Sequence, residues 1–212
     1  MADQNAIEPK MHWNQVYATK AVDTVSWFQP HAEDSLRFLQ KTGVNQLAAI
    51  IDVGGGASTL VDDLLLSGHS NVSVLDISEK ALLATKNRLE SRANQVNWLM
   101  ADITKATLPA HSVDVWHDRA VFHFLTSADD RQAYIQNMLH AVKPNGHVII
   151  ATFAEDGPMK CSGLDTVGYS ANSLHEALGE SFTLIAHEEV QHHTPGGNVQ
   201  QFNYCYFRVL SQ

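Results

Sequence analysis

The sequence contains only two cysteines, Cys161 and Cys205, among its 212 residues. Two cysteines so far apart cannot provide a disulfide framework or the four ligands of a structural zinc site. Low cysteine usage is typical of proteins of a reducing compartment, so we expect a cytoplasmic protein with no metal centre. His192 and His193 stand together, but without helical or cysteine-paired spacing they are expected in a solvated hairpin loop.

Long hydrophobic runs are also missing. No apolar stretch approaches the roughly 20 residues that a membrane-spanning helix needs. The first ten residues, MADQNAIEPK, lack the basic and apolar regions of a signal peptide. We therefore expect no membrane partner.

Basic residues are scarce, with 14 Lys and Arg against 23 Asp and Glu and a formal net charge of −9. Proteins that bind nucleic acid usually present a basic face to the phosphates, so nucleic acid is an improbable partner. The length and the 44% hydrophobic content suit one globular core. We predict a single domain over residues 1–212, and a monomer or homodimer.

Strand-like and helix-like segments alternate through the middle of the chain, which predicts parallel strands joined by right-handed helical crossovers. The tail breaks this alternation, because two strand-like runs there are joined only by a turn-rich link and should form an antiparallel hairpin. The predicted fold is α/β: a doubly wound, mostly parallel seven-stranded sheet with a C-terminal antiparallel hairpin and helices on both faces. Expected strands cover 47–53, 72–75, 96–100, 113–117, 147–153, 182–190 and 200–209, and expected helices cover 31–42, 58–67, 78–92, a segment beginning at Ser127, and 171–178.

Three parts follow from this pattern. Residues 1–30 are polar with interspersed aromatic residues and show weak periodicity, so they are assigned as an N-terminal lid or substrate segment. Residues 47–153 are the expected cofactor-binding core. Residues 154–212 are the expected substrate loop and terminal hairpin.

Three glycines, Gly54, Gly55 and Gly56, directly follow a buried strand that carries Asp52. A phosphate-binding P-loop would need a second glycine followed by Lys, which is absent. A dinucleotide fingerprint would need Gly or Ala where Thr59 stands, and a carboxylate at position 52 would repel a pyrophosphate. The loop therefore suits a ligand with a cationic group near Asp52.

Two more acids follow the next strands. Asp76 is placed to accept hydrogen bonds from ribose hydroxyls, and Asp102 from an adenine amine. Carboxyl ends of parallel strands meet at one edge of the sheet, so the three acids would face one ligand. A nucleoside that carries an amino acid has the matching groups, and S-adenosylmethionine is such a molecule.

Four segments resemble those of the class I, seven-strand, S-adenosylmethionine-dependent methyltransferases: IIDVGGGAS, VSVLDIS, WLMADIT and AVKPNGHVIIATF. The resemblance covers roughly residues 47–153 and implies S-adenosylmethionine as cofactor and S-adenosylhomocysteine as product. It departs from the family at Ser58, where the last loop glycine is usual. The cofactor-binding residues that it implies are Asp52, Gly54, Gly55, Gly56, Asp76, Ile77, Asp102, Ile103, Asp118 and Trp13.

The end of the fourth expected strand supplies candidates for the acceptor side. His117, Asp118 and Arg119 offer a possible base, an acceptor for the cofactor ammonium and a fixed cation, and His123 is a second candidate base. Each has a structural alternative: Arg119 could pair with Asp118 or Asp130, and His123 could lie on a helix surface. Trp13 could line the site as part of a lid or could pack as docking core.

Two further resemblances concern the acceptor. The DRA at 118–120 with the later DDRQAY is similar to thiopurine and related small-thiol methyltransferases. The Trp13-x-x-x-Tyr17 spacing is similar to several small enzymes of the family, including protein-lysine methyltransferases. We predict methyl transfer to a small-molecule nucleophile, a thiol, amine or metalloid. The alternatives are protein-lysine methylation, a non-catalytic cofactor-binding module, and an NAD-linked reductase.

Overall fold

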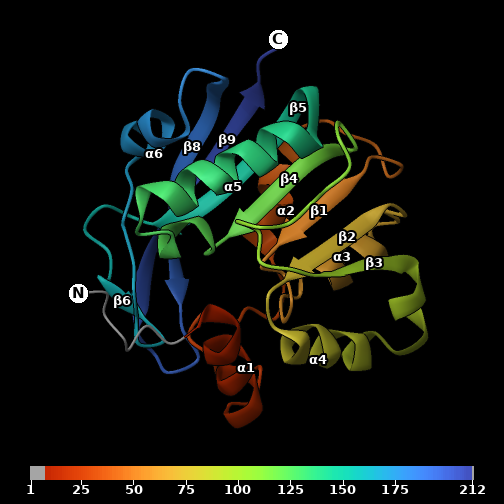
Figure 1. Cartoon of the computed structure of the whole chain (residues 1–212). Helices are drawn as coiled ribbons and strands as arrows, with labels where there is room; N and C mark the ends of the chain where they lie inside the picture. Colours follow the sequence, from red (N-terminus) through yellow and green to blue (C-terminus); the bar gives the residue numbers. More distant parts are fainter. Residues whose placement is uncertain (1–7, 212) are drawn as a thin grey trace.

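The computed structural model describes residues 8–211 and contains a seven-stranded sheet flanked by helices on both faces (Figure 1). Strands β1 to β5 run parallel in the order β3-β2-β1-β4-β5, β9 pairs antiparallel with β5, and the edge strand β8 pairs antiparallel with β9. This confirms the predicted fold class. The strands are β1 (Ile50–Val53), β2 (Val72–Asp76), β3 (Val96–Met100), β4 (Val113–Arg119), β5 (Val142–Phe153), β6 (Lys160–Cys161), β7 (Leu164–Asp165), β8 (Phe182–His193) and β9 (Val199–Val209).

The α-helices lie before, between and beyond the parallel strands, and those between consecutive parallel strands fill the crossovers that such strands require. They are α1 (Pro9–Thr19), α2 (Glu33–Lys41), α3 (Leu60–Leu66), α4 (Glu79–Leu89), α5 (Ala128–Ala141) and α6 (Ala171–Leu178), with short 3₁₀ turns η1 (Glu90–Gln95) and η2 (Phe122–Phe124). Ser78, Ser127 and Ser170 cap α4, α5 and α6 through their side chains. Within residues 8–211, no helix has the length and apolar character to cross a membrane.

The strand order reverses between β1 and β4. The chain moves outward from β1 to β2 and β3, then returns to place β4 on the other side of β1. A crevice opens at the carboxyl ends of strands at such a reversal point, and ligands of open α/β sheets bind there. The ends of β1 and β4 are therefore the expected ligand site.

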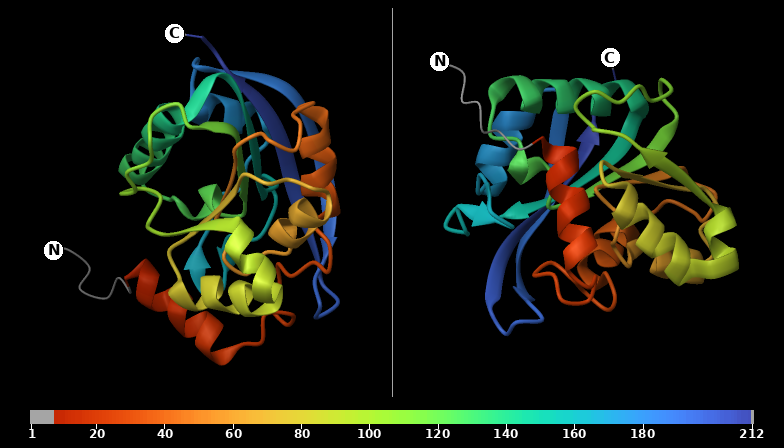
Figure 2. Two further views of the ribbon diagram at one scale, coloured as in Figure 1. Left: turned by 90° about the vertical axis from the view of Figure 1, so that its right-hand side faces the viewer. Right: turned by 60° about the horizontal axis from the view of Figure 1, so that its bottom comes forward.

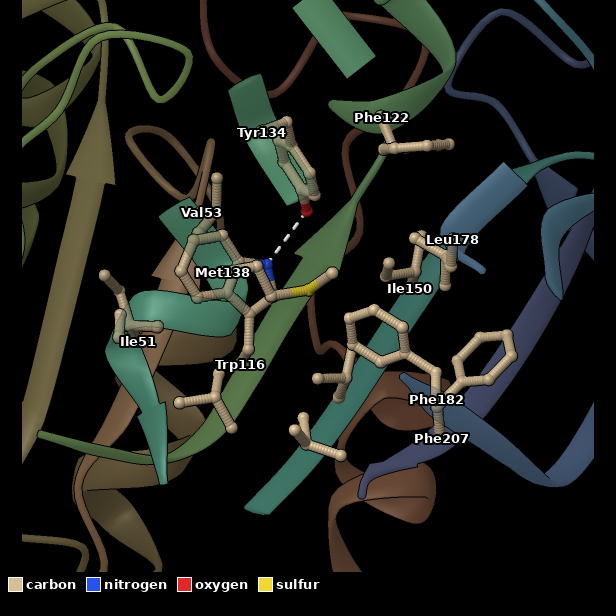
Figure 3. Packing of buried hydrophobic residues seen from close by; sticks show 14 of the residues in the cluster. Ile51, Val53, Trp116, Phe122, Tyr134, Met138, Ile150, Leu178, Phe182 and Phe207 are labelled. Carbon is tan, nitrogen blue, oxygen red and sulfur yellow. Dashed lines mark hydrogen bonds between the residues drawn. The ribbon is translucent and has the colours of Figure 1, made fainter. Parts of the chain in front are cut away.

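Alternation along each strand divides the core into two layers on opposite sides of the sheet. Figure 2 shows the helices that cover the sheet. Ile51, Val53 and Trp116 point toward α5 and α6, and the indole Nε1 of Trp116 donates a 2.9 Å hydrogen bond to the Tyr134 hydroxyl of α5 (Figure 3). Residues of opposite parity on the same strands, such as Ile50 and Val115, pack with α2, α3 and α4. This parity decides which side chains of β4 share a site.

Three local features differ from the sequence predictions. Helix α1 forms within residues 1–30, the predicted lid or substrate segment, where no helix was expected. Val16 is its only buried residue, so its sequence carried almost no periodic signal. Strand β5 starts at Val142 rather than at 147 and passes through Asn145, whose φ is 60°. The predicted loop 155–170 contains the small β6–β7 hairpin. Residues 1–7 of the predicted lid lie outside the described residues.

Candidate cofactor and acceptor site

The glycine loop, Gly54 to Gly56, follows the end of β1 at the point where the strand order reverses. Gly54 has φ +71°, a conformation that glycine adopts without strain, and its N–H donates a 2.7 Å hydrogen bond to the Leu75 carbonyl of β2. A side chain on Gly55 would collide with the Asp52 carboxylate, and one on Gly56 with that of Asp76. The second and third glycines therefore let backbone lie against two carboxylates.

Asp52 and His117 face each other across β1 and β4. Their register makes them direct neighbours, and Nδ1 of His117 lies 2.7 Å from Oδ1 of Asp52. Both side chains are only 2% exposed. Within the described part of the chain, Oδ2 of Asp52 and Nε2 of His117 have no hydrogen-bond partner. Asp52 thus keeps one buried acceptor available.

Asp76 ends β2 and connects the glycine loop to α4. Its carboxylate accepts a 2.9 Å hydrogen bond from the Gly56 N–H and a 2.7 Å hydrogen bond from the Ser78 N–H. Burial raises the pKa of this carboxyl to about 6, although the two N–H donors act in the opposite direction. A carboxylate has further lone pairs, so Asp76 can still accept from ribose hydroxyls. Ile77, the half-buried residue between Asp76 and Ser78, lies at the same strand end.

Asp102 and Ile103 lie in the turn after β3. Burial acts to raise the pKa of Asp102, but hydrogen bonds from Thr104 and Lys105 outweigh it and hold that pKa below its usual value. Oδ1 of Asp102 accepts from the Thr104 N–H at 3.0 Å and from its hydroxyl at 2.7 Å. Ile103 is buried. The pair therefore presents an ionised acid beside an apolar side chain, as an adenine would require.

His117, Asp118 and Arg119 do not act as one group, because neighbours on a strand point to opposite faces. Asp118 points toward α5, where it accepts hydrogen bonds from the N–H groups of Val121 (2.8 Å) and Phe122 (3.0 Å) and from the Tyr134 hydroxyl (2.6 Å). Burial raises the pKa of Asp118 to about 6. Asp118 therefore stabilises the loop after β4 by accepting hydrogen bonds from its backbone. Its predicted contact with the cofactor ammonium stays a prediction.

Arg119 lies on the same face as Asp52 and His117, half-buried. Its Nε donates to the Tyr204 hydroxyl at 3.1 Å, its Nη1 donates to the Trp27 carbonyl at 3.0 Å, and its guanidinium lies 4.7 Å from the centre of the Phe202 ring. Among residues 8–211, no carboxylate lies within ion-pair distance of Arg119. The alternative pairing with Asp118 or Asp130 is therefore wrong.

His123 is fully buried in η2, so its alternative placement on a helix surface is also wrong. Its Nδ1 accepts a 3.2 Å hydrogen bond from the Phe153 N–H, and its ring stacks on the Phe153 ring at 4.3 Å. Burial and then the charge of Arg119 lower the pKa of His123 to about 3, which keeps the ring neutral at physiological pH. Its predicted role as a base stays a prediction.

Part of residues 8–30 lies at the ends of β1 and β4. Helix α1 lies beside α4 (Figure 2), and Oδ1 of Asn14 accepts a 2.9 Å hydrogen bond from the Ser78 hydroxyl. Trp13 packs edge-on against Trp27 at 5.7 Å and Phe124 at 5.2 Å between ring centres. A cavity, which we call the strand-end cavity, opens beside this cluster and is lined by Tyr17, Trp27, Ser35, Asp52, Gly55 and Arg119, among others.

Sequence reasoning missed three of these contributors: Asn14, Ser35 and Tyr204. The Tyr204 hydroxyl lies 3.4 Å from the Ser35 hydroxyl and receives the Arg119 hydrogen bond, so it links β9 and α2 to the end of β4. No motif marks these residues, because they reach the site from segments far apart in sequence. The resemblance to known cofactor motifs covered only roughly residues 47–153.

Comparison with known proteins agrees with this geometry. Residues 50–146 match the family described as methyltransferase domain. EEF1A lysine methyltransferase 2 of Danio rerio is 27% identical over 123 residues, which cover 55% of this chain. The same-named protein of Mus musculus is 22% identical over 162 residues, or 70% of this chain. The matched part of the chain spans about half (53%) of the Danio rerio protein and 66% of the mouse protein.

Solved structures share the fold at low sequence identity. The structure described for conversion of a disulfide bond into a thioacetal group during echinomycin biosynthesis has a TM-score of 0.78 at 15% identity, covering 96% of this chain and 92% of that one. The Burkholderia thailandensis 1,6-didemethyltoxoflavin-N1-methyltransferase, with bound 1,6-didemethyltoxoflavin and S-adenosylhomocysteine, has a TM-score of 0.70 at 16% identity. It covers 99% of this chain and 93% of that one.

The site, the domain match over residues 50–146 and the shared fold together support a class I S-adenosylmethionine-dependent methyltransferase. The residues present fit the cofactor: Asp52 keeps a buried unpartnered acceptor, and the side-chain-free glycines leave the backbone open beside Asp52 and Asp76. When bound, S-adenosylmethionine supplies a methyl group activated by its positive sulfur. The chain supplies position, electrostatics and exclusion of water.

Proposed function

We propose that the enzyme methylates an electron-rich small-molecule nucleophile, with thiols the first class to test and amines and metalloids after them. The observation that carries this proposal is Arg119, which lines the strand-end cavity as a half-buried cation and has no carboxylate partner among residues 8–211. A partly buried charge is costly unless something compensates it, and an anionic acceptor would do so. The guanidinium would also lower the pKa of a thiol beside it.

The same cation disfavours an ammonium-type acceptor. Two like charges roughly 5 Å apart repel by about 1–3 kcal/mol in a partly solvated site. Burial and the charge of Arg119 lower the pKa of His123 and keep it neutral, so His123 does not offset the positive charge of Arg119. These electrostatics favour an anionic or neutral acceptor over a lysine side chain.

Protein-lysine methylation is the second candidate, and sequence similarity favours it. The curated relatives from Danio rerio, Mus musculus and Homo sapiens are all named EEF1A lysine methyltransferase 2, at 27%, 22% and 21% identity. The chain covers only 53% of the first of them, so their substrate is a candidate acceptor.

A screen with S-adenosylmethionine carrying a labelled methyl group separates the two. The acceptors would be small thiols with and without a carboxylate, small amines, arsenite and purified EEF1A. We expect label in a thiol, with Arg119→Met lowering kcat/KM for that thiol by about 10–100-fold. Arg37→Met serves as the matched control, because Arg37 pairs with Asp34 and Glu188 near the surface. Label in EEF1A alone would refute the proposal.

A further inference from the structure

The Asp52–His117 pair lies directly behind the glycine loop. Its two residues occupy matched positions on neighbouring parallel strands and are both 2% exposed. His117 is the only hydrogen-bond partner of the Asp52 side chain found within residues 8–211. His117 does not line the strand-end cavity, whereas Asp52 does. The histidine therefore reaches that cavity only through the carboxylate.

The chemistry of the pair fixes the proton on one nitrogen. An ionised carboxylate only accepts hydrogen bonds, so Nδ1 of His117 carries the proton that it donates to Oδ1 of Asp52. This bond leaves Oδ2 without a partner, pressed against the backbone of Gly55. Nε2 of His117 is also buried without a partner. Buried polar atoms without partners lower the stability of the fold, and such a cost is expected where the atoms bind a ligand.

We propose that His117 is a positioning residue that holds the Asp52 carboxylate so that Oδ2 receives the ammonium group of the cofactor. It does so without touching the cofactor. The proposal rests on the identification of S-adenosylmethionine as the cofactor and adds a specific division of labour: Oδ1 is held by β4 and Oδ2 is kept for the ligand. Without His117, the carboxylate would lose its orienting donor and rotate about its terminal bond.

Two ligands and two shape-matched variants test this. His117→Asn keeps an N–H close to the position of Nδ1, and His117→Leu replaces it with a methyl group. S-adenosylhomocysteine carries the ammonium, whereas 5′-methylthioadenosine is the same thioether nucleoside without the aminoacyl part. Calorimetric dissociation constants of both ligands would be measured for the wild type and the two variants.

We expect His117→Leu to weaken S-adenosylhomocysteine binding by about 10–100-fold and to change 5′-methylthioadenosine binding by less than about threefold. His117→Asn should restore most of the loss. If His117 had only a structural role, its loss would weaken binding of both ligands equally, and His117→Asn would not restore S-adenosylhomocysteine binding selectively. Equal weakening of both ligands, or unchanged S-adenosylhomocysteine binding in the Leu variant, would overturn the proposal.

Asp52→Asn provides a second route if the Leu variant does not fold. This change removes the negative charge, so it should weaken the binding of S-adenosylhomocysteine and leave the binding of 5′-methylthioadenosine unchanged. Adding His117→Met, which also removes the ring donor, in that background should then cause no further loss, because both changes act on one contact. Additive losses would contradict the proposal. A wild type that binds neither ligand would instead refute the cofactor assignment, so the two failures are distinguishable.

Discussion

The raised pKa of Asp76 predicts that nucleoside binding depends on pH. Burial brings this pKa to about 6 in the folded chain, from the ordinary aspartate value of 3.8. Only the ionised carboxylate accepts hydrogen bonds at both oxygens, so we expect the ionised form to bind the ribose. Affinity should be constant well above pH 6 and should fall about tenfold for each pH unit below it.

The same shift has an opposite effect on the free protein. Because the folded state binds the Asp76 proton more tightly than the unfolded state does, this group destabilises the fold as pH rises from about 4 to about 6. The shift corresponds to a total of about 3 kcal/mol, at 1.36 kcal/mol per pKa unit. Hydrogen bonds from the ribose would offset part of that cost. The chain thus keeps at its ligand site a charge that weakens the ligand-free fold.

The assay is calorimetric titration of 5′-methylthioadenosine between pH 5 and pH 8 at constant ionic strength. This ligand keeps the ribose and lacks the ammonium, so the contact with Asp52 does not contribute. We expect a dissociation constant about tenfold larger at pH 5 than at pH 7.5. Asp76→Asn should bind weakly and show no such slope. A wild-type constant that does not change over this range, or the same slope in Asp76→Asn, would refute the reasoning.

Two further changes test the supports of the site. Tyr134→Phe removes a hydroxyl that donates to the buried carboxylate of Asp118 and accepts from the indole of Trp116. We expect the free energy of unfolding, measured in urea, to fall by about 3 kcal/mol. The Tyr206 hydroxyl contacts only the imidazole of His147 among the described residues, so Tyr206→Phe should lower the free energy of unfolding by about 1 kcal/mol. Equal losses in the two variants would contradict this reasoning. Gly55→Ala should weaken S-adenosylhomocysteine binding at least about tenfold by displacing the Asp52 carboxylate, whereas Gly196→Ala in the hairpin turn should leave binding unchanged.

The sheet was predictable from the sequence because its signals are local. Buried parallel strands are short apolar runs, and capping serines mark the helices between them. Helix α1 was not predictable in this way, since it buries one residue and is placed by contacts such as Asn14 with α4. Its position depends on the folded core, which residues 9–19 do not encode on their own.

The candidate site was predictable where it depends on strand ends and not where it depends on side-chain direction. The sequence led to Asp52, Asp76 and Asp102 because parallel strands end at one edge. It grouped His117, Asp118 and Arg119 because they are adjacent, although the period of two sends Asp118 to the opposite face. Contacts between distant segments, such as Arg119 with Tyr204, carry no sequence signal at all.

The charges along the strand-end cavity favour some acceptors over others. The cavity is lined by an acid, Asp52, and by a cation, Arg119, that has no carboxylate partner in the described part of the chain. An amine becomes positive as it gains a methyl group, so its repulsion from Arg119 would grow along the reaction. A thiolate becomes neutral and would begin the reaction stabilised by the guanidinium. Such differences are larger in a site shielded from water than in solution. Arg119 should therefore act mainly on which acceptor is used, and Asp52 on whether the cofactor binds.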